Sequence, residues 1–163
     1  LPFVAEDLGD VTEAVDELRR EFGLPGMRVL QFAFDGSPGN LHLPHHINRD
    51  AVAYTGTHDN DTTLGWYRAL DDAARQRVDF LLRSDLLPMP EALLRAALAS
   101  PASLAVLPIQ DLLGLGSEAR FNTPGTMAGN WCWKLWHGAL DDGLAGWCRA
   151  LNQAYGRDTR MSA

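Results

Sequence analysis

Apolar runs alternate with amphipathic stretches along the chain, and each apolar run ends in polar residues. Two of these runs, residues 1–5 and 28–34, are bounded by charged or turn-forming residues and predict buried strands. Between them, apolar positions recur at helical spacing from Thr12, placed to cap a helix, to Gly23, placed just past its end. The chain is therefore predicted to start with a strand, a helix and a second strand.

The same alternation continues through the rest of the chain. Residues 51–55 and 103–109 predict a third and a fourth strand, with helical patterns over residues 62–84 and 91–99 between them. A last helix is predicted near residues 144–155. Strands that alternate with helices indicate an α/β fold with a parallel sheet and right-handed crossovers. About four such β/α units make half of a (β/α)8 TIM-type barrel, which is the fold we expect.

Composition and charge narrow the classes of function. The 163 residues are 46% hydrophobic and 21% charged, which is typical of a globular domain. Acidic residues exceed basic ones by 21 to 14, giving a net charge of −7, so no nucleic acid and no membrane are expected as partners. Cys132 and Cys148 form no disulfide framework, and we expect free thiols in a reducing, cytoplasmic compartment.

Acidic side chains follow every predicted strand. They are Glu6, Asp7, Asp35, Asp59, Asp61 and Asp111. Because the carboxyl ends of parallel strands share one rim, these groups are expected to converge there. Converging carboxylates perturb one another's protonation and suit general acid/base work on glycosidic bonds. The alternative for any single acid is a capping or loop-stabilising role, and the tryptophans near Asn130 are interpreted first as core residues, second as sugar-stacking surfaces.

Four motifs stand in order along the chain, and two more follow them. They are AEDLG at residues 5–9, FGLPGMRVLQFAF at 22–34, YTGTHDNDT at 54–62, QDLLGLG at 110–116, RFNTPG at 120–125 and GNWCW at 129–133. Together these motifs strongly resemble the C-terminal part of the catalytic domain of amylomaltase. That enzyme is the bacterial member of the 4-α-glucanotransferase family (glycoside hydrolase family 77), to which plant disproportionating enzyme is related.

The resemblance implies a fold, a reaction and a set of site residues. The family has a barrel and transfers α-1,4-glucan segments between maltodextrins by a retaining double displacement that needs no cofactor and no metal. By the resemblance, Glu6 is the general acid/base and Asp59 is the carboxylate that stabilises the transition state. The expected substrate-binding residues are His58, Asp35, Asn60, Asn122 and Asn130.

The family's nucleophile is an Asp after the fourth barrel strand, and the resemblance leaves no residue of this chain for that role. We therefore expect residues 1–163 to be the C-terminal part of the catalytic barrel, inactive alone. Its expected partners are α-1,4-glucans and maltooligosaccharides, the missing N-terminal half of the barrel and, by self-association, other copies of the chain.

Two other functions stay open on the sequence. A metal-dependent hydrolase would draw on six candidate ligands: His42, His45, His46, His58, Asp59 and Asp61. Their spacing fits no ligand frame, and Pro44 opposes a helix that would present the first three histidines on one face. A non-catalytic carbohydrate-binding chain is the other alternative, because one essential catalytic group has no candidate here.

Overall fold

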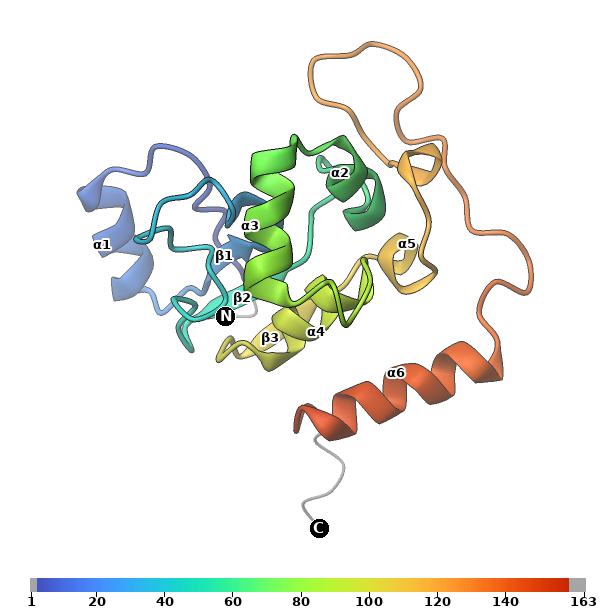
Figure 1. Ribbon diagram of the computed structural model, residues 1–163. Helices are drawn as coiled ribbons and strands as arrows, with labels where there is room; N and C mark the ends of the chain where they lie inside the picture. Colours follow the sequence, from blue (N-terminus) through green and yellow to red (C-terminus); the bar gives the residue numbers. More distant parts are fainter. Residues whose placement is uncertain (1–2, 159–163) are drawn as a thin grey trace.

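A small parallel sheet forms the centre of the protein. The computed structural model describes residues 3–158 and shows three strands in the order β1 (Gly26–Val29), β2 (Ala51–Tyr54) and β3 (Leu104–Val106) (Figure 1). Both pairs are parallel, with Met27 opposite Val52 and Val52 opposite Leu104. The predicted α/β fold with a parallel sheet is thus confirmed.

Helices make up most of the remaining regular structure. They are α1 (Glu13–Glu21), α2 (Thr63–Ala69), α3 (Asp72–Leu82), α4 (Glu91–Ala99), α5 (Ile109–Leu112), α6 (Asp142–Ala154) and the 3₁₀ turns η1 (Leu30–Phe32) and η2 (Ser117–Ala119). The sequence pattern predicts the ends of α1, α4 and α6 to within a few residues of those in the structure. The pattern over residues 62–84 forms two helices, because Leu70 is extended and the Asp71 side chain accepts from the Ala74 N–H and starts α3.

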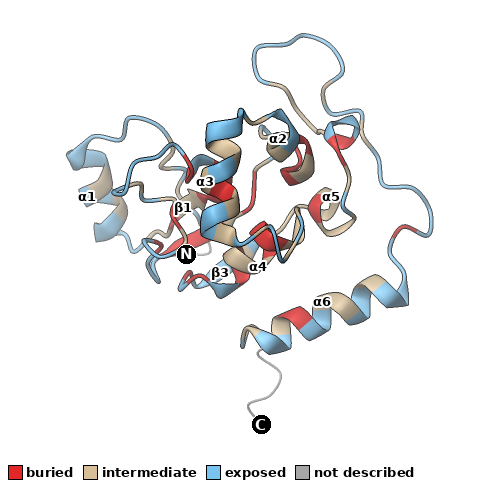
Figure 2. Ribbon diagram, viewed as in Figure 1, coloured by how far each residue is buried: buried red, intermediate tan, exposed pale blue. Residues whose placement is uncertain are grey.

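Helices α3 and α4 cover one face of the sheet (Figure 1). Ala51 and Ala53 of β2 join Val78 of α3 and Leu93 of α4 in one buried cluster. Figure 2 shows buried residues gathered beneath these helices, whereas α1 and much of the outer chain are exposed. The small alanine side chains let the helices approach the sheet closely, so the core lies on this side.

The two predicted strands nearest the N-terminus differ from the structure. Residues 1–2 lie outside the described part, and residues 3–5 form no strand, because one backbone hydrogen bond, from Ala5 N–H to Pro25 C=O, replaces a ladder. The strand expected over residues 28–34 ends at Val29 and continues as η1. A continuous apolar run does not distinguish a strand from a helical turn, and here residues 30, 33 and 34 turn into the helix-covered core.

The fourth predicted strand is also shorter than expected. Strand β3 ends at Val106, and the following Pro108 has no N–H for a ladder and instead precedes the first residue of α5. A long segment without helix or strand, residues 120–141, then leads out to α6 (Figure 1).

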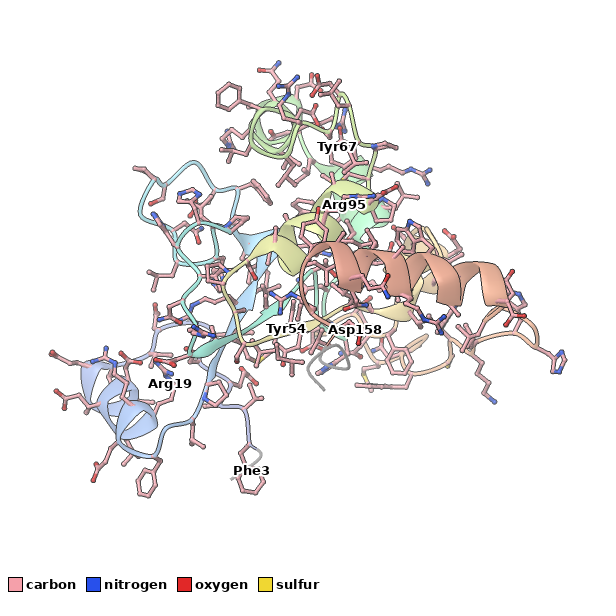
Figure 3. The ribbon with its side chains drawn as sticks, turned by 90° about the horizontal axis from the view of Figure 1, so that it is seen from below. Phe3, Arg19, Tyr54, Tyr67, Arg95 and Asp158 are labelled. Carbon is pink, nitrogen blue, oxygen red and sulfur yellow. The ribbon has the colours of Figure 1, made fainter. Side chains whose placement is uncertain are left out.

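Helix α6 returns to the body of the protein beside α4. Just after α6, the Arg157 guanidinium donates to the carbonyls of Leu98, Ser100 and Ala102, at 2.7, 2.8 and 3.1 Å. Figure 3 shows Arg95 of α4 between α4 and α6. Its guanidinium donates to the Glu91 carboxylate at 2.8 Å. These contacts anchor the end of the described chain to the loop before β3. Among the described residues, no helix has both the length and the apolarity to cross a membrane.

Candidate active site

A cavity of about 580 Å³ lies beyond the carboxyl ends of the strands. Its walls come from Glu6 and Leu8, from the loop after β2, from Val106 and residues 108–110, and from residues 119–121 at the start of the long segment. Tyr54 and Val106, which are partners across β2 and β3, form part of its floor. In parallel α/β proteins this edge of the sheet is where ligands bind.

The loop after β2 places three of the expected site residues at the cavity. His58, Asp59 and Asn60 all line it. The loop owes its shape to Asn60, whose Oδ1 accepts from the Thr57 N–H at 2.9 Å and from the Thr57 hydroxyl at 2.8 Å. The Asn60 side chain therefore orders the loop that presents His58 and Asp59.

The Asp59 carboxylate is oriented by its neighbours. Its Oδ1 accepts from Asn122 Nδ2 at 2.6 Å and lies 3.4 Å from His58 Nε2. The Arg120 guanidinium donates to the Asp59 carbonyl at 2.8 Å and to the Asn122 carbonyl at 2.9 Å. The Asp59 side chain is still about half exposed, at 49%, so it is held in one direction and open to a ligand.

Asn130 and the tryptophans shape the long segment beside the loop. Asn130 Oδ1 accepts from the Thr123 N–H at 2.9 Å, and this contact closes a turn of the segment itself. The Trp131 ring lies 5.3 Å from the His58 ring and is 58% exposed. The expectation that tryptophans near Asn130 are core residues is wrong for Trp131, because the sheet's core lies on the opposite face. An exposed ring beside His58 is the arrangement in which indoles stack on ligands.

Glu6 reaches the cavity from the segment before α1. No hydrogen bond or ion pair engages its carboxylate within the described residues, and its side chain is exposed. The neighbouring Asp7 fixes the main chain there: its carboxylate accepts from the Met27 N–H at 2.6 Å and from Arg28 at 2.9 Å. Gly26 is needed beside it, since a Cβ at that position would lie 2.2 Å from Asp7 Oδ2.

The structure does not bring Asp35 to the same cavity. Asp35 follows η1 rather than the end of a strand, and it is not among the cavity's lining residues. Its carboxylate accepts from the Ser37 N–H at 2.8 Å, and this bond, with help from Asn40, lowers the pKa of the Asp35 carboxyl. Asp35 orders its own turn in this structure.

The predicted convergence of all the acids is wrong for Asp35, Asp7 and Asp111. Asp7 is bound to β1 as described, and Asp111 is buried with 1% exposed surface. Asp61 does line the cavity, and its carboxylate accepts from the Ser117 hydroxyl at 2.6 Å. Burial raises the pKa of the Asp111 carboxyl even though hydrogen bonds from Thr55 and Thr63 oppose the shift. Glu6, Asp59 and Asp61 thus line the cavity together, and Glu6 and Asp59 are the two for which the resemblance predicts a catalytic role.

The histidines considered as metal ligands make other contacts in the structure. His42 Nδ1 accepts from the Val29 N–H at 3.0 Å, and His46 Nδ1 lies 2.9 Å from the Asn40 carbonyl. Within residues 3–158, no group of three or more His, Cys, Asp or Glu side chains is arranged to hold a metal ion. Sequence reasoning gave no role to Arg120, whose place inside the RFNTPG motif was the available signal.

Parallel strands with an acid-lined cavity at their carboxyl ends define an α/β protein of the kind that carries enzymatic sites. Comparison with known proteins gives the family: the family model described as 4-alpha-glucanotransferase matches residues 1–138. The chain belongs to this 4-alpha-glucanotransferase family.

Individual relatives agree with the family assignment. The 4-alpha-glucanotransferase of Synechocystis is 48% identical over 159 residues, covering 96% of this chain and 32% of that protein. The 4-alpha-glucanotransferase of Thermus thermophilus is 48% identical over 162 residues, covering 94% of this chain and 32% of that protein. The chain therefore spans about a third of the length of these relatives.

Solved structures show the same fold. An amylomaltase from Streptococcus agalactiae in complex with acarbose superposes with a TM-score of 0.89 at 30% identity, covering 96% of this chain and 32% of that one. An amylomaltase from Corynebacterium glutamicum superposes with a TM-score of 0.57 at 21% identity, covering 81% of this chain and 24% of that one, and supports the fold alone.

Proposed function

We propose that this chain forms the C-terminal part of the catalytic barrel of a 4-α-glucanotransferase, which moves α-1,4-glucan segments between maltooligosaccharides by a retaining mechanism. The observation that carries the proposal is the cavity that Glu6 and Asp59 share at the carboxyl end of the sheet. The acarbose complex of the related amylomaltase supports an oligosaccharide as the ligand of such a cavity.

In this proposal Glu6 is the general acid/base. Its carboxyl, which is exposed and has no bonded partner among residues 3–158, can protonate the leaving glycosidic oxygen and later take the proton of the incoming sugar hydroxyl. Asp59, held by Asn122, stabilises the positive charge that develops on the sugar ring in the transition state. His58 and Asn122 contact sugar hydroxyls beside it, and Trp131 offers a ring for stacking.

Three further residues are proposed to support substrate binding without acting on the reacting bond. They are Asn60, Asn130 and Asp35. Asn60 and Asn130 use their side-chain oxygens to order the two segments that flank the cavity. The Asn130 amide nitrogen also donates within its own turn, to the Thr126 carbonyl at 3.1 Å, so Asn60 is the one of the two whose amide nitrogen is proposed to contact sugar. Asp35, which lies outside the cavity, is proposed to bind the glucan away from the reacting bond. Asp35→Asn is therefore expected to change KM more than kcat.

A retaining transfer also needs a nucleophilic carboxylate about 5 to 5.5 Å from the general acid. We propose that it comes from a segment of the protein outside these residues. Exposed apolar side chains mark where such a segment would pack. Leu18 on α1 is 54% exposed, Phe22 just after α1 is 67% exposed, and Val106 at the cavity is 39% exposed. Self-association of the chain is the alternative way to cover them.

The proposal concerning location rests on the thiols. Cys132 and Cys148 are both free, which fits a reducing compartment such as the cytoplasm.

Product analysis with maltotriose tests the proposed function. The protein at its natural length is expected to release glucose and to form longer maltodextrins, with retention of the α configuration at each new bond. The 163-residue chain alone is expected to release neither. Absence of transfer by the natural protein contradicts the activity, and transfer by the isolated chain contradicts a nucleophile from outside it.

A further inference from the structure

One buried carboxylate holds both ends of the loop that carries His58 and Asp59. Asp111 Oδ2 accepts from the Thr55 hydroxyl at 2.6 Å and from the Thr63 hydroxyl at 2.7 Å, and its Oδ1 accepts from the Thr63 N–H at 2.7 Å. Thr55 follows the last residue of β2 and Thr63 is the first residue of α2. The two ends of the loop are thus tied to a single side chain.

Gln31 supports the same loop at two further points. Its backbone N–H donates to the Thr55 carbonyl at 3.3 Å and its side-chain amide donates to the Asp61 carbonyl at 2.9 Å. Gly56 leaves room for this amide, because a Cβ there would lie 2.7 Å from Gln31 Nε2. The loop is therefore supported at both ends and at Asp61, and His58 and Asp59 between these supports line the cavity.

Burying the Asp111 carboxylate in this position costs folding free energy. Its side chain is almost fully buried, and within the described residues its hydrogen bonds come from Thr55 and Thr63, with no basic side chain bonded to it. Burying a carboxylate without a cation costs free energy that hydrogen bonds compensate only in part. A role in stability alone would be served better by apolar packing, so the cost points to a need for defined loop geometry.

We propose that Asp111 is a positioning residue, which fixes the loop from Thr55 to Thr63 so that Asp59 and His58 are presented to the cavity in one geometry. Its effect on catalysis rests on the proposed function, since Asp59 acts there on the sugar. Its effect on the loop does not, and can be measured without substrate. Asp111 itself touches no reacting atom.

Amide hydrogen exchange of the protein at its natural length tests the loop geometry. Asp111→Ala removes both attachments, and exchange at residues 57–61 is expected to accelerate at least about tenfold relative to wild type. Asp111→Asn keeps one oxygen for the Thr63 N–H and an amide that can donate to the two hydroxyls, so it is expected to restore most of the protection. Unchanged exchange in Asp111→Ala overturns the proposal.

Kinetics of maltodextrin transfer separate positioning from general destabilisation. Asp111→Ala is expected to lower kcat about 10²-fold with KM nearly unchanged, because a small displacement of a transition-state group costs about that much. Asp79→Ala is the matched control: Asp79 also accepts from two hydroxyls, those of Tyr67 and Ser84, but it lies on α3 away from the loop. Its kcat per folded molecule is expected to equal that of wild type.

Three outcomes decide the matter. If Asp111→Ala and Asp79→Ala reduce kcat alike, the positioning role is contradicted. If wild type shows no transfer, the proposed function fails and the exchange measurement still decides the positioning role. If Asp111→Ala does not fold, the double variant Thr55→Val and Thr63→Val removes the hydroxyl donors at nearly constant volume, and unchanged exchange and kcat in it overturn the proposal.

Discussion

The two faces of the sheet are built differently. On the helix-covered face, Leu93 of α4 and Val78 of α3 have no exposed surface, and they pack on the alanines of β2. On the cavity face, Val106 of β3 keeps 39% of its surface exposed, and the cavity that it lines combines apolar side chains with the acidic and amide groups of the site. The comparison teaches that the covered face supplies the folding free energy, whereas the open face holds groups that are useful because nothing in the described chain covers them.

The largest expected effect is a loss of activity without a loss of stability, in a variant of Glu6 on the cavity face. Glu6→Gln keeps the shape of the side chain and removes the titrating proton, so transfer activity of the protein at its natural length should fall about 10³-fold, about 4 kcal/mol in the barrier. The free energy of unfolding should stay within about 0.5 kcal/mol of wild type, because no hydrogen bond or ion pair to the Glu6 carboxylate is present in the described part of the chain. Glu17→Gln, an exposed change on α1, is the control and should alter neither quantity. Near-normal activity in Glu6→Gln would remove it from the proposed mechanism.

The reverse pattern is expected at Leu93. Leu93→Ala leaves a cavity in the covered core and should lower the free energy of unfolding by about 2 to 5 kcal/mol. Activity per folded molecule should be unchanged, since Leu93 lies on the face opposite the cavity. Urea unfolding provides the measurement, with Leu86→Ala as control, because Leu86 is 73% exposed and its loss should cost less than about 0.5 kcal/mol.

The buried Asp111 carboxyl is expected to make the free energy of unfolding depend on pH. Burial raises the pKa of the Asp111 carboxyl above its ordinary value of 3.8, so the folded protein binds this proton more tightly than the unfolded chain does. The resulting stability is fully present below about pH 3.8 and is lost as pH rises through the pKa of the folded state. Relative to Asp111→Asn, wild type is therefore expected to be less stable at pH 7 than at acidic pH. A difference in unfolding free energy that does not change with pH would show that Asp111 is not perturbed.

Much of the fold could be predicted from the sequence because its strongest signals are local. Helix α1 is marked by Thr12 and Gly23, and α6 by its apolar spacing. Strand ends were less predictable. The apolar run after Val29 turns into η1 because Leu30 and Phe34 pack into the helix-covered core, and this tertiary contact has no signal in the spacing alone.

The site residues could be predicted from motifs that resemble a known family. They could be predicted less well from the position of an acidic residue after a strand. Glu6, His58 and Asp59 were named from motifs, and they line one cavity. Asp7 and Asp111 were grouped with them because each follows a strand, but hydrogen bonds to Met27 and Thr63 take their carboxylates away from the cavity. Whether an acid faces solvent or a backbone N–H depends on contacts between residues far apart in sequence.

The smallest effect is expected from a valine on each face. Val78→Ala and Val106→Ala remove the same two methyl groups, but Val78 is fully buried and Val106 is 39% exposed. In the 163-residue chain, Val78→Ala should cost about 2 kcal/mol and Val106→Ala less than about 1 kcal/mol, because exposed methyl groups lose little transfer free energy. In the protein at its natural length, the proposed covering of the cavity face should raise the cost at Val106 towards that at Val78. Urea unfolding of both variants in both chain lengths gives the four values. Equal costs for the two valines in the 163-residue chain would mean that Val106 is already covered there, by self-association, and light scattering would then show a mass above that of a monomer.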